Sequence, residues 1–140
     1  MAMVFSGAFG KNIEIVAREM DVAALRQNVI ANNIANADTP NFKRSVVNFE
    51  SQLKRALDSE KIQPFPQYVT NARHIAFDKP MDWTQVQPRR VLDYLTEAKN
   101  NGNNVDIEEE GMSALNNQLL YTTLAQVISS EIQRVNIVLR

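Results

Sequence analysis

The sequence has no cysteine, one histidine and four glycines among its 140 residues. Without cysteine the chain forms no disulfide and offers neither a thiolate nucleophile nor a cysteine ligand for zinc. Its 15 Lys and Arg residues are balanced by 16 Asp and Glu residues, which leaves a formal net charge of −1. The chain therefore lacks the basic surplus with which nucleic-acid-binding proteins displace counterions, and we expect no nucleic acid among its partners.

A run of 18 apolar residues is also missing, so we expect no helix that spans a membrane. The first ten residues are apolar, but no basic region precedes them as it would in a cleaved secretory signal peptide. If the protein leaves the cytoplasm, we expect it to do so by another route and without cleavage of a signal peptide.

The motifs of common catalytic sites are missing as well: nucleophile elbows, phosphate-binding loops, zincin helices and dinucleotide fingerprints. His74 has no evident orienting partner, so a structural or capping role is favoured over catalysis. The acidic residues Asp106 and 108–110 lack the alternating ligands and central glycine of a calcium loop, and the electrostatics of a helix start explain them. We therefore predict no enzyme, no catalytic residue, no cofactor and no metal.

Four of the five prolines crowd the middle third of the chain: Pro64, Pro66, Pro80 and Pro88. This distribution predicts an N-terminal helical arm with a turn at its end (1–45), a central irregular region (46–104) and a long C-terminal helix that pairs with the first arm (105–140). The expected fold is mainly α and elongated. Its terminal helices form a coiled-coil-like axial core, and its short Pro-rich centre carries a short helix and some extended segments.

Both terminal helices follow from the spacing of apolar residues. From Ile13 to Ile34 these residues recur at alternating spacings of 3 and 4, with Gln27 as the one polar member, which predicts a helix of about 25 residues that Pro40 terminates. The C-terminal helix begins with a capping box in which Asp106 is the N-cap and Glu109 the third helical residue. It has room for about 33 residues, or ~50 Å. A compact globule of this size is only roughly 37 Å across, so we expect an elongated molecule.

Residues 111–130 carry no charge, although they are too polar for lipid. An exposed helix of a soluble monomer normally presents charges to water, so we expect neighbouring subunits to cover this helix and the first one. The predicted subunit-interface residues are Ile13, Val16, Met20, Ile30, Asn33, Ile34, Asn36, Leu120, Leu124, Ile128, Val135 and Leu139.

The most informative segment is residues 31–44, which read A-N-N-I-A-N-A-D-T-P-N-F-K-R. Pro40 suits the first central position of a turn, and Asn41 tolerates positive φ at the next. The predicted signature turn comprises Asp38, Thr39, Pro40, Asn41 and Phe42. This segment resembles the N-terminal signature of the axial proteins of the bacterial flagellum, A-N-N-I-A-N-x-x-T-P-G-Y-K, with Asn and Phe in place of Gly and Tyr.

Within that family the chain is most similar to proximal rod proteins, on its short length and on residues 73–75 and 102–110. The resemblance implies a structural subunit of the periplasmic rod of the basal body, the drive shaft for motility, that polymerises through its terminal helices. It also implies export, unprocessed, by the flagellar type III apparatus. The implied partners are further copies of the chain and other rod proteins, which are FlgC-, FlgF- and FliE-like.

Two alternatives stay open. One is the FlgC-like neighbour in the proximal rod, because the features that separate the two are weaker than the family signature. The other is a cytoplasmic coiled-coil adaptor or export chaperone that binds a partner helix reversibly. An adaptor would explain the rows of apolar residues on the two helices. It would not explain the turn after Asn36, and it would be expected to carry charges on its outward face.

Overall fold

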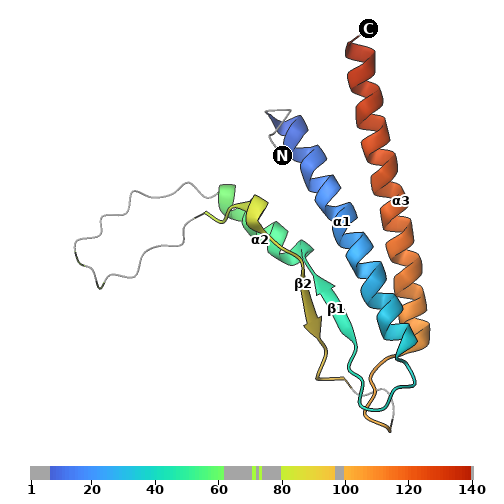
Figure 1. The fold of residues 1–140 in the computed structure, drawn as a ribbon. Helices are drawn as coiled ribbons and strands as arrows, with labels where there is room; N and C mark the ends of the chain where they lie inside the picture. Colours follow the sequence, from blue (N-terminus) through green and yellow to red (C-terminus); the bar gives the residue numbers. More distant parts are fainter. Residues whose placement is uncertain (1–6, 62–70, 72, 74–79, 97–99, 140) are drawn as a thin grey trace. The chain divides into compact units, whose positions relative to one another are not determined.

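The computed structural model describes residues 7–61, 71, 73, 80–96 and 100–139. Within these residues the chain is mainly helical (Figure 1). Its elements are α1 (Ala8–Ala35), β1 (Ser45–Asn48), α2 (Glu50–Lys61), the 3₁₀ helix η1 (Trp83–Gln85), β2 (Arg89–Leu92) and α3 (Ile107–Val138). Two long terminal helices and a centre with a short helix and extended pieces confirm the predicted mainly α fold.

The chain divides into two compact units. One consists of Met1–Val47 together with Arg90–Arg140, and the other is Asn48–Arg89. The first unit contains α1 and α3, whereas the second contains α2 and η1. His74 lies outside the described residues, as do Pro64 and Pro66.

In the first unit α1 and α3 pack side by side and run antiparallel (Figure 1). Asn33 near the end of α1 contacts Glu110 in the first turn of α3, and Asn117 further along α3 contacts the carbonyl of Ala23. The 32 residues of α3 span about 48 Å, so the helix is slightly longer than its 28-residue partner.

Apolar burial in this unit is concentrated at the end of the pair where α1 finishes. Val22, Ala23, Val29 and Ile30 of α1 are buried, together with Val105 just before α3. Burying one such Val or Ile side chain contributes about 1.5–3 kcal/mol. The buried residues of α1 lie on one face, as in an amphipathic helix, but this face only partly matches the predicted 3–4 series, because Ile34 at the end of that series is exposed.

The second unit has a small core of its own. Phe49, Leu53 and Ala56 are buried on one face of α2 and its N-terminal flank, and Trp83 and Val86 are buried in and beside η1. The second unit therefore has a small hydrophobic core, although it lies in the region that was predicted to be irregular.

No helix among the described residues combines the length and the hydropathy needed to cross a bilayer.

Candidate functional site

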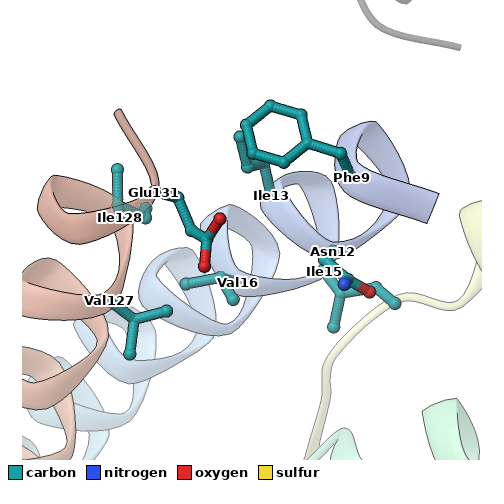
Figure 2. Close-up of a pocket in the computed structure, with 8 residues that line it drawn as sticks. All are labelled: Phe9, Asn12, Ile13, Ile15, Val16, Val127, Ile128 and Glu131. Carbon is teal, nitrogen blue, oxygen red and sulfur yellow. The ribbon is translucent and has the colours of Figure 1, made fainter. Parts of the chain in front are cut away.

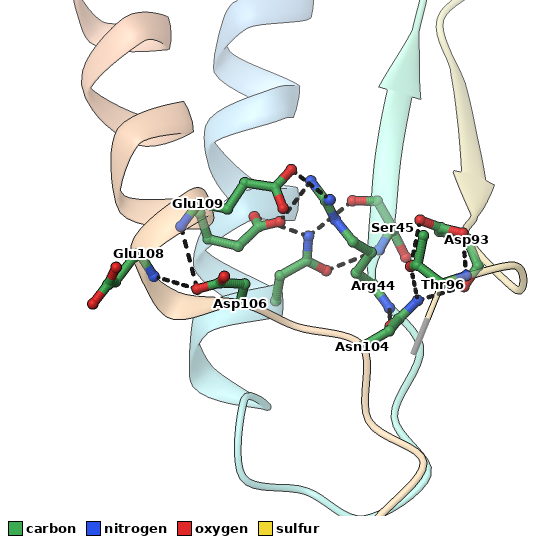
Figure 3. Close-up of polar contacts among 10 residues, drawn as sticks. Arg44, Ser45, Asp93, Thr96, Asn104, Asp106, Glu108 and Glu109 are labelled. Atoms are coloured by element: carbon green, nitrogen blue, oxygen red, sulfur yellow. Dashed lines mark hydrogen bonds and ion pairs between the residues drawn. The ribbon is translucent and has the colours of Figure 1, made fainter. Parts of the chain in front are cut away.

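Where α1 ends and α3 begins, a group of polar side chains fills the space between them (Figure 3). We call this group the polar junction, and its members are Asn33, Arg44, Ser45, Asn103, Asn104 and Glu110. Asn33, which is fully buried, donates from Nδ2 to the Ser45 carbonyl at 2.8 Å and to Glu110 Oε2 at 3.1 Å. Its Oδ1 accepts from the Ser45 backbone N–H at 3.0 Å. One amide thus joins α1, β1 and α3.

Arg44 supplies the positive charge of the junction. Its guanidinium lies 2.8 Å from Glu109 Oε1 and 3.0 Å from Glu110 Oε1, and the Glu110 side chain is 1% exposed. Burial by itself lowers the pKa of Arg44, but its hydrogen bond to Glu109 and the charge of Glu110 outweigh burial and raise that pKa above its ordinary value. The junction therefore favours the charged form of the Arg44 guanidinium.

The two asparagines before α3 bind backbone groups of distant segments. Asn104 Oδ1 accepts from the Arg44 N–H at 2.6 Å, while its Nδ2 donates to the Asp93 carbonyl at 2.7 Å and to Thr96 Oγ1 at 3.1 Å. Thr96 also donates to Asp93 Oδ2, and this bond, together with the backbone N–H of Leu95, lowers the pKa of Asp93. Asn104 therefore ties the segment before α3 to Arg44, which precedes β1, and to Asp93, which follows β2.

Asn103 closes the C-terminal end of α1. Its Nδ2 lies 2.8–3.0 Å from the carbonyl oxygens of Asn36, Ala37 and Thr39. Helix ends leave carbonyls without intrahelical partners, and this side chain from the loop before α3 supplies a donor for them. Asn36 and Ala37 belong to residues 31–44, the segment that resembles the signature of the flagellar axial proteins.

The signature turn lies directly beyond this cap. The Phe42 N–H points to the Thr39 carbonyl at 3.4 Å, and Asn41 has φ of 59°, so Pro40 and Asn41 occupy the two central positions. Asn41 donates its N–H to the Asn101 carbonyl at 3.0 Å. Asp38 and Thr39 are exposed and Phe42 is half-buried. The turn is thus bound to the loop that precedes α3.

The predicted helix cap lies at the start of α3. Asp106 Oδ1 accepts from the N–H groups of Glu108 at 2.9 Å and Glu109 at 3.5 Å, as an N-cap does (Figure 3). The side chain of Glu109 is directed to Arg44, which is a contact that local sequence spacing cannot indicate.

The residues predicted for subunit contacts lie in several environments. Ile30 is buried and Ile34 and Leu139 are exposed. Asn33 belongs to the polar junction, and Asn36 is half-buried and donates its side-chain amide to the Asn32 carbonyl. The remaining members are half-buried: Ile13, Val16, Met20, Leu120, Leu124, Ile128 and Val135. Much of this set therefore lies along the pairing of α1 with α3 inside one chain, and its role between subunits stays a prediction.

A cavity of about 290 Å³ opens between the first half of α1 and the second half of α3 (Figure 2). Apolar side chains form most of its wall, and Asn12 and Glu131 add polar groups. Its lining residues are Phe9, Asn12, Ile13, Ile15, Val16, Val127, Ile128 and Glu131. The helices are therefore packed tightly at one end of the pair and incompletely at the other.

Sequence reasoning missed a row of exposed apolar residues on α3. Met112, Leu115 and Leu119, which we call the outer stripe, are 60%, 67% and 67% exposed. Their spacing of 3 and 4 places them on one helix face. This spacing, which is separate from that of the inner face, could have indicated the outer stripe from the sequence. Asn117, which is buried against α1, marks the opposite face.

These features are suited to protein–protein contact rather than to chemistry. Among the described residues no group of three or more histidine, aspartate or glutamate side chains is arranged to hold a metal ion. The Glu110 carboxylate of the polar junction is bound to Arg44 and Asn33 and serves to hold the segments together. Exposed rows of apolar side chains are typical of interaction surfaces.

Comparison with known proteins places these features in a family. Residues 20–43, which contain the second half of α1 and the signature turn, match the family model described as "Flagella basal body rod protein". The chain is 41% identical over 132 residues to the flagellar basal body rod protein FlgB of Borrelia hermsii, an alignment that covers 94% of this chain and 98% of that protein.

More distant relatives carry the same description. The flagellar basal body rod protein FlgB of Bacillus subtilis is 30% identical over 131 residues, which cover 94% of this chain and 95% of the relative. That of Escherichia coli is 29% identical over 118 residues, with 81% and 82% covered. The similarity therefore extends through both terminal helices and the centre.

Proposed function

The chain belongs to the flagellar basal body rod protein family, and from this premise we propose that it is a structural, non-catalytic subunit of the flagellar rod. The observation that carries the proposal is the near full-length similarity to proteins of that name, with 41% identity to the first of them. The second half of α1 and the turn between α1 and β1, where the family model matches, support it.

Assembly proceeds through surfaces that the folded chain leaves uncovered. The outer stripe is apolar and exposed, and residues 111–130 around it carry no charge that would have to be desolvated. Burying each side chain of the stripe against a neighbour contributes about 1.5–3 kcal/mol. A contact between two different faces adds subunits head to tail, and it builds an open filament when the rotation between neighbours does not close a ring.

The position of the subunit is a finer part of the proposal. We assign it to the proximal rod in the periplasm, as an FlgB-type subunit of the drive shaft for motility, rather than as its FlgC-like neighbour. The shared FlgB description of the relatives favours this choice. Its partners are then further copies and other rod proteins, FlgC-, FlgF- and FliE-like, and the flagellar type III apparatus exports it without a cleaved signal peptide.

The experiment replaces Leu115 and Leu119 together with lysine and follows basal bodies and swimming. We expect the double variant to be exported and helical but absent from purified basal bodies, because two buried charges would outweigh the apolar contact. The matched control replaces the exposed residues Asn116 and Gln118 with lysine, one on each side of the outer stripe. Normal swimming and rod incorporation of the Leu115/Leu119 variant would reject this surface, and recovery of the wild-type protein in cytosol alone would reject the rod assignment in favour of the adaptor.

A further inference from the structure

The helix α3 has two apolar faces, and only one of them packs against α1. The inner face contains Leu120 and Leu124 but also the buried amide of Asn117. The outer stripe lies about 200° away, because Leu115 and Leu119 are each two residues from Asn117. Over the first turns of α3, apolar burial alone would therefore be satisfied equally well, or better, if α3 turned its outer stripe towards α1, although beyond Leu119 that face continues with Thr122, Thr123 and Gln126.

The polar junction distinguishes these arrangements because its contacts are directional. Glu110 reaches both Arg44 and Asn33 only from its present side of α3. Half a turn of α3 would leave Arg44 with one carboxylate fewer and expose Glu110. A slip by one heptad would carry Glu110 about 10 Å along the axis, out of reach of both partners.

We propose that the polar junction is a register lock, in which Glu110, Arg44 and Asn33 determine which face of α3 meets α1 and at what height. A buried polar residue in a helix pair commonly selects one register at a cost in stability. Through the proposed function, the lock also decides that Met112, Leu115 and Leu119 are the residues presented to neighbouring subunits.

The test uses pairs of engineered cysteines in the isolated full-length chain, which has no cysteine of its own. Met20→Cys with Leu124→Cys reports the present register, since both residues are half-buried at matching heights of the antiparallel pair. Met20→Cys with Gln126→Cys reports a rotated α3, and Met20→Cys with Glu131→Cys reports a slip of one heptad. Disulfide formation under mild oxidation is measured for each pair.

With the junction intact, we expect the Leu124 pair to form its disulfide at least about tenfold faster than either alternative pair. In the Glu110→Leu background that preference should fall towards equality while circular dichroism still shows the helices. Glu108→Leu is the matched control, because it removes the same charge from the same turn at an exposed position, and it should keep the preference.

An undiminished preference in Glu110→Leu would overturn the lock, whatever its melting temperature. If Glu110→Leu loses its helicity, the same measurement is made on Glu110→Gln, which keeps the side-chain volume and removes the ion pair. A preserved preference there overturns the proposal equally. Because the experiment uses unassembled chains, its outcome is independent of whether the protein builds a rod.

Discussion

Three asparagine side chains pair backbone groups around the C-terminal end of α1. Asn33 bonds both backbone groups of Ser45, Asn103 lies against three carbonyls of the turn, and Asn104 accepts from the Arg44 N–H. Asparagine suits this task because one side chain both donates and accepts. Asparagines that cluster near the end of α1 and in the loop before α3 thus serve tertiary hydrogen bonding.

Replacing Asn103 with alanine should destabilise the first unit by about 2–3 kcal/mol, because carbonyls of the turn lose their donor and the Val105 N–H loses its acceptor. Urea denaturation followed by circular dichroism measures the change. Asn100→Ala, at an exposed position of the same loop, is the control and should change the free energy of unfolding by less than about 0.5 kcal/mol. Equal effects of the two variants would contradict the role given to Asn103.

At the scale of the elements, the two long helices could be predicted because their periodicity extends over many turns. Asp106 and Pro40 also indicate where α3 begins and α1 has ended. The orientation of the first turns of α3 was harder to predict, because they carry apolar residues on an outward face and because the contact of Glu110 with Arg44 joins residues that are 66 apart in the sequence. The strands β1 and β2 could not be predicted either, because a segment of four residues is too short to show the alternation of apolar and polar residues that indicates a strand.

The packing along α3 predicts a gradient of hydrogen exchange in the isolated chain. Residues 110–120 lie beside the buried part of α1, whereas Ile132, Ile137 and Val138 are 52–84% exposed. We expect amides of residues 132–138 to exchange at least about a hundredfold faster than those of 114–120, because local opening costs less where few side chains are buried. Mass spectrometry of exchanged fragments measures this, and uniform protection along α3 would contradict it.

For the whole molecule, the net charge is too small to keep copies of the chain apart by electrostatic repulsion. The formal net charge is −1, while exposed apolar residues occur on α3 and around β2, where Leu92, Tyr94 and Leu95 are 42–97% exposed. Net charge near zero favours association of such surfaces.

The isolated chain should therefore self-associate at neutral pH as its concentration rises, and added salt should not dissociate it, because the contacts are apolar. Sedimentation velocity measures the association. Leu115→Glu with Leu119→Glu should shift the chain towards monomer, whereas Asn116→Glu with Gln118→Glu should do so less. Dissociation of the wild-type chain by salt would show that charge pairs hold the copies together.

The antiparallel course of α1 and α3 has a practical consequence for labelling. The first turn of α1 and the last turns of α3 lie at the same end of the pair, beside Phe9 and Glu131 (Figures 1 and 2). A fluorescent protein attached directly before α1 or directly after α3 would lie at that one end and crowd it. A small thiol dye on Glu108→Cys avoids the problem, because this position lies at the far end and the natural chain contains no competing thiol.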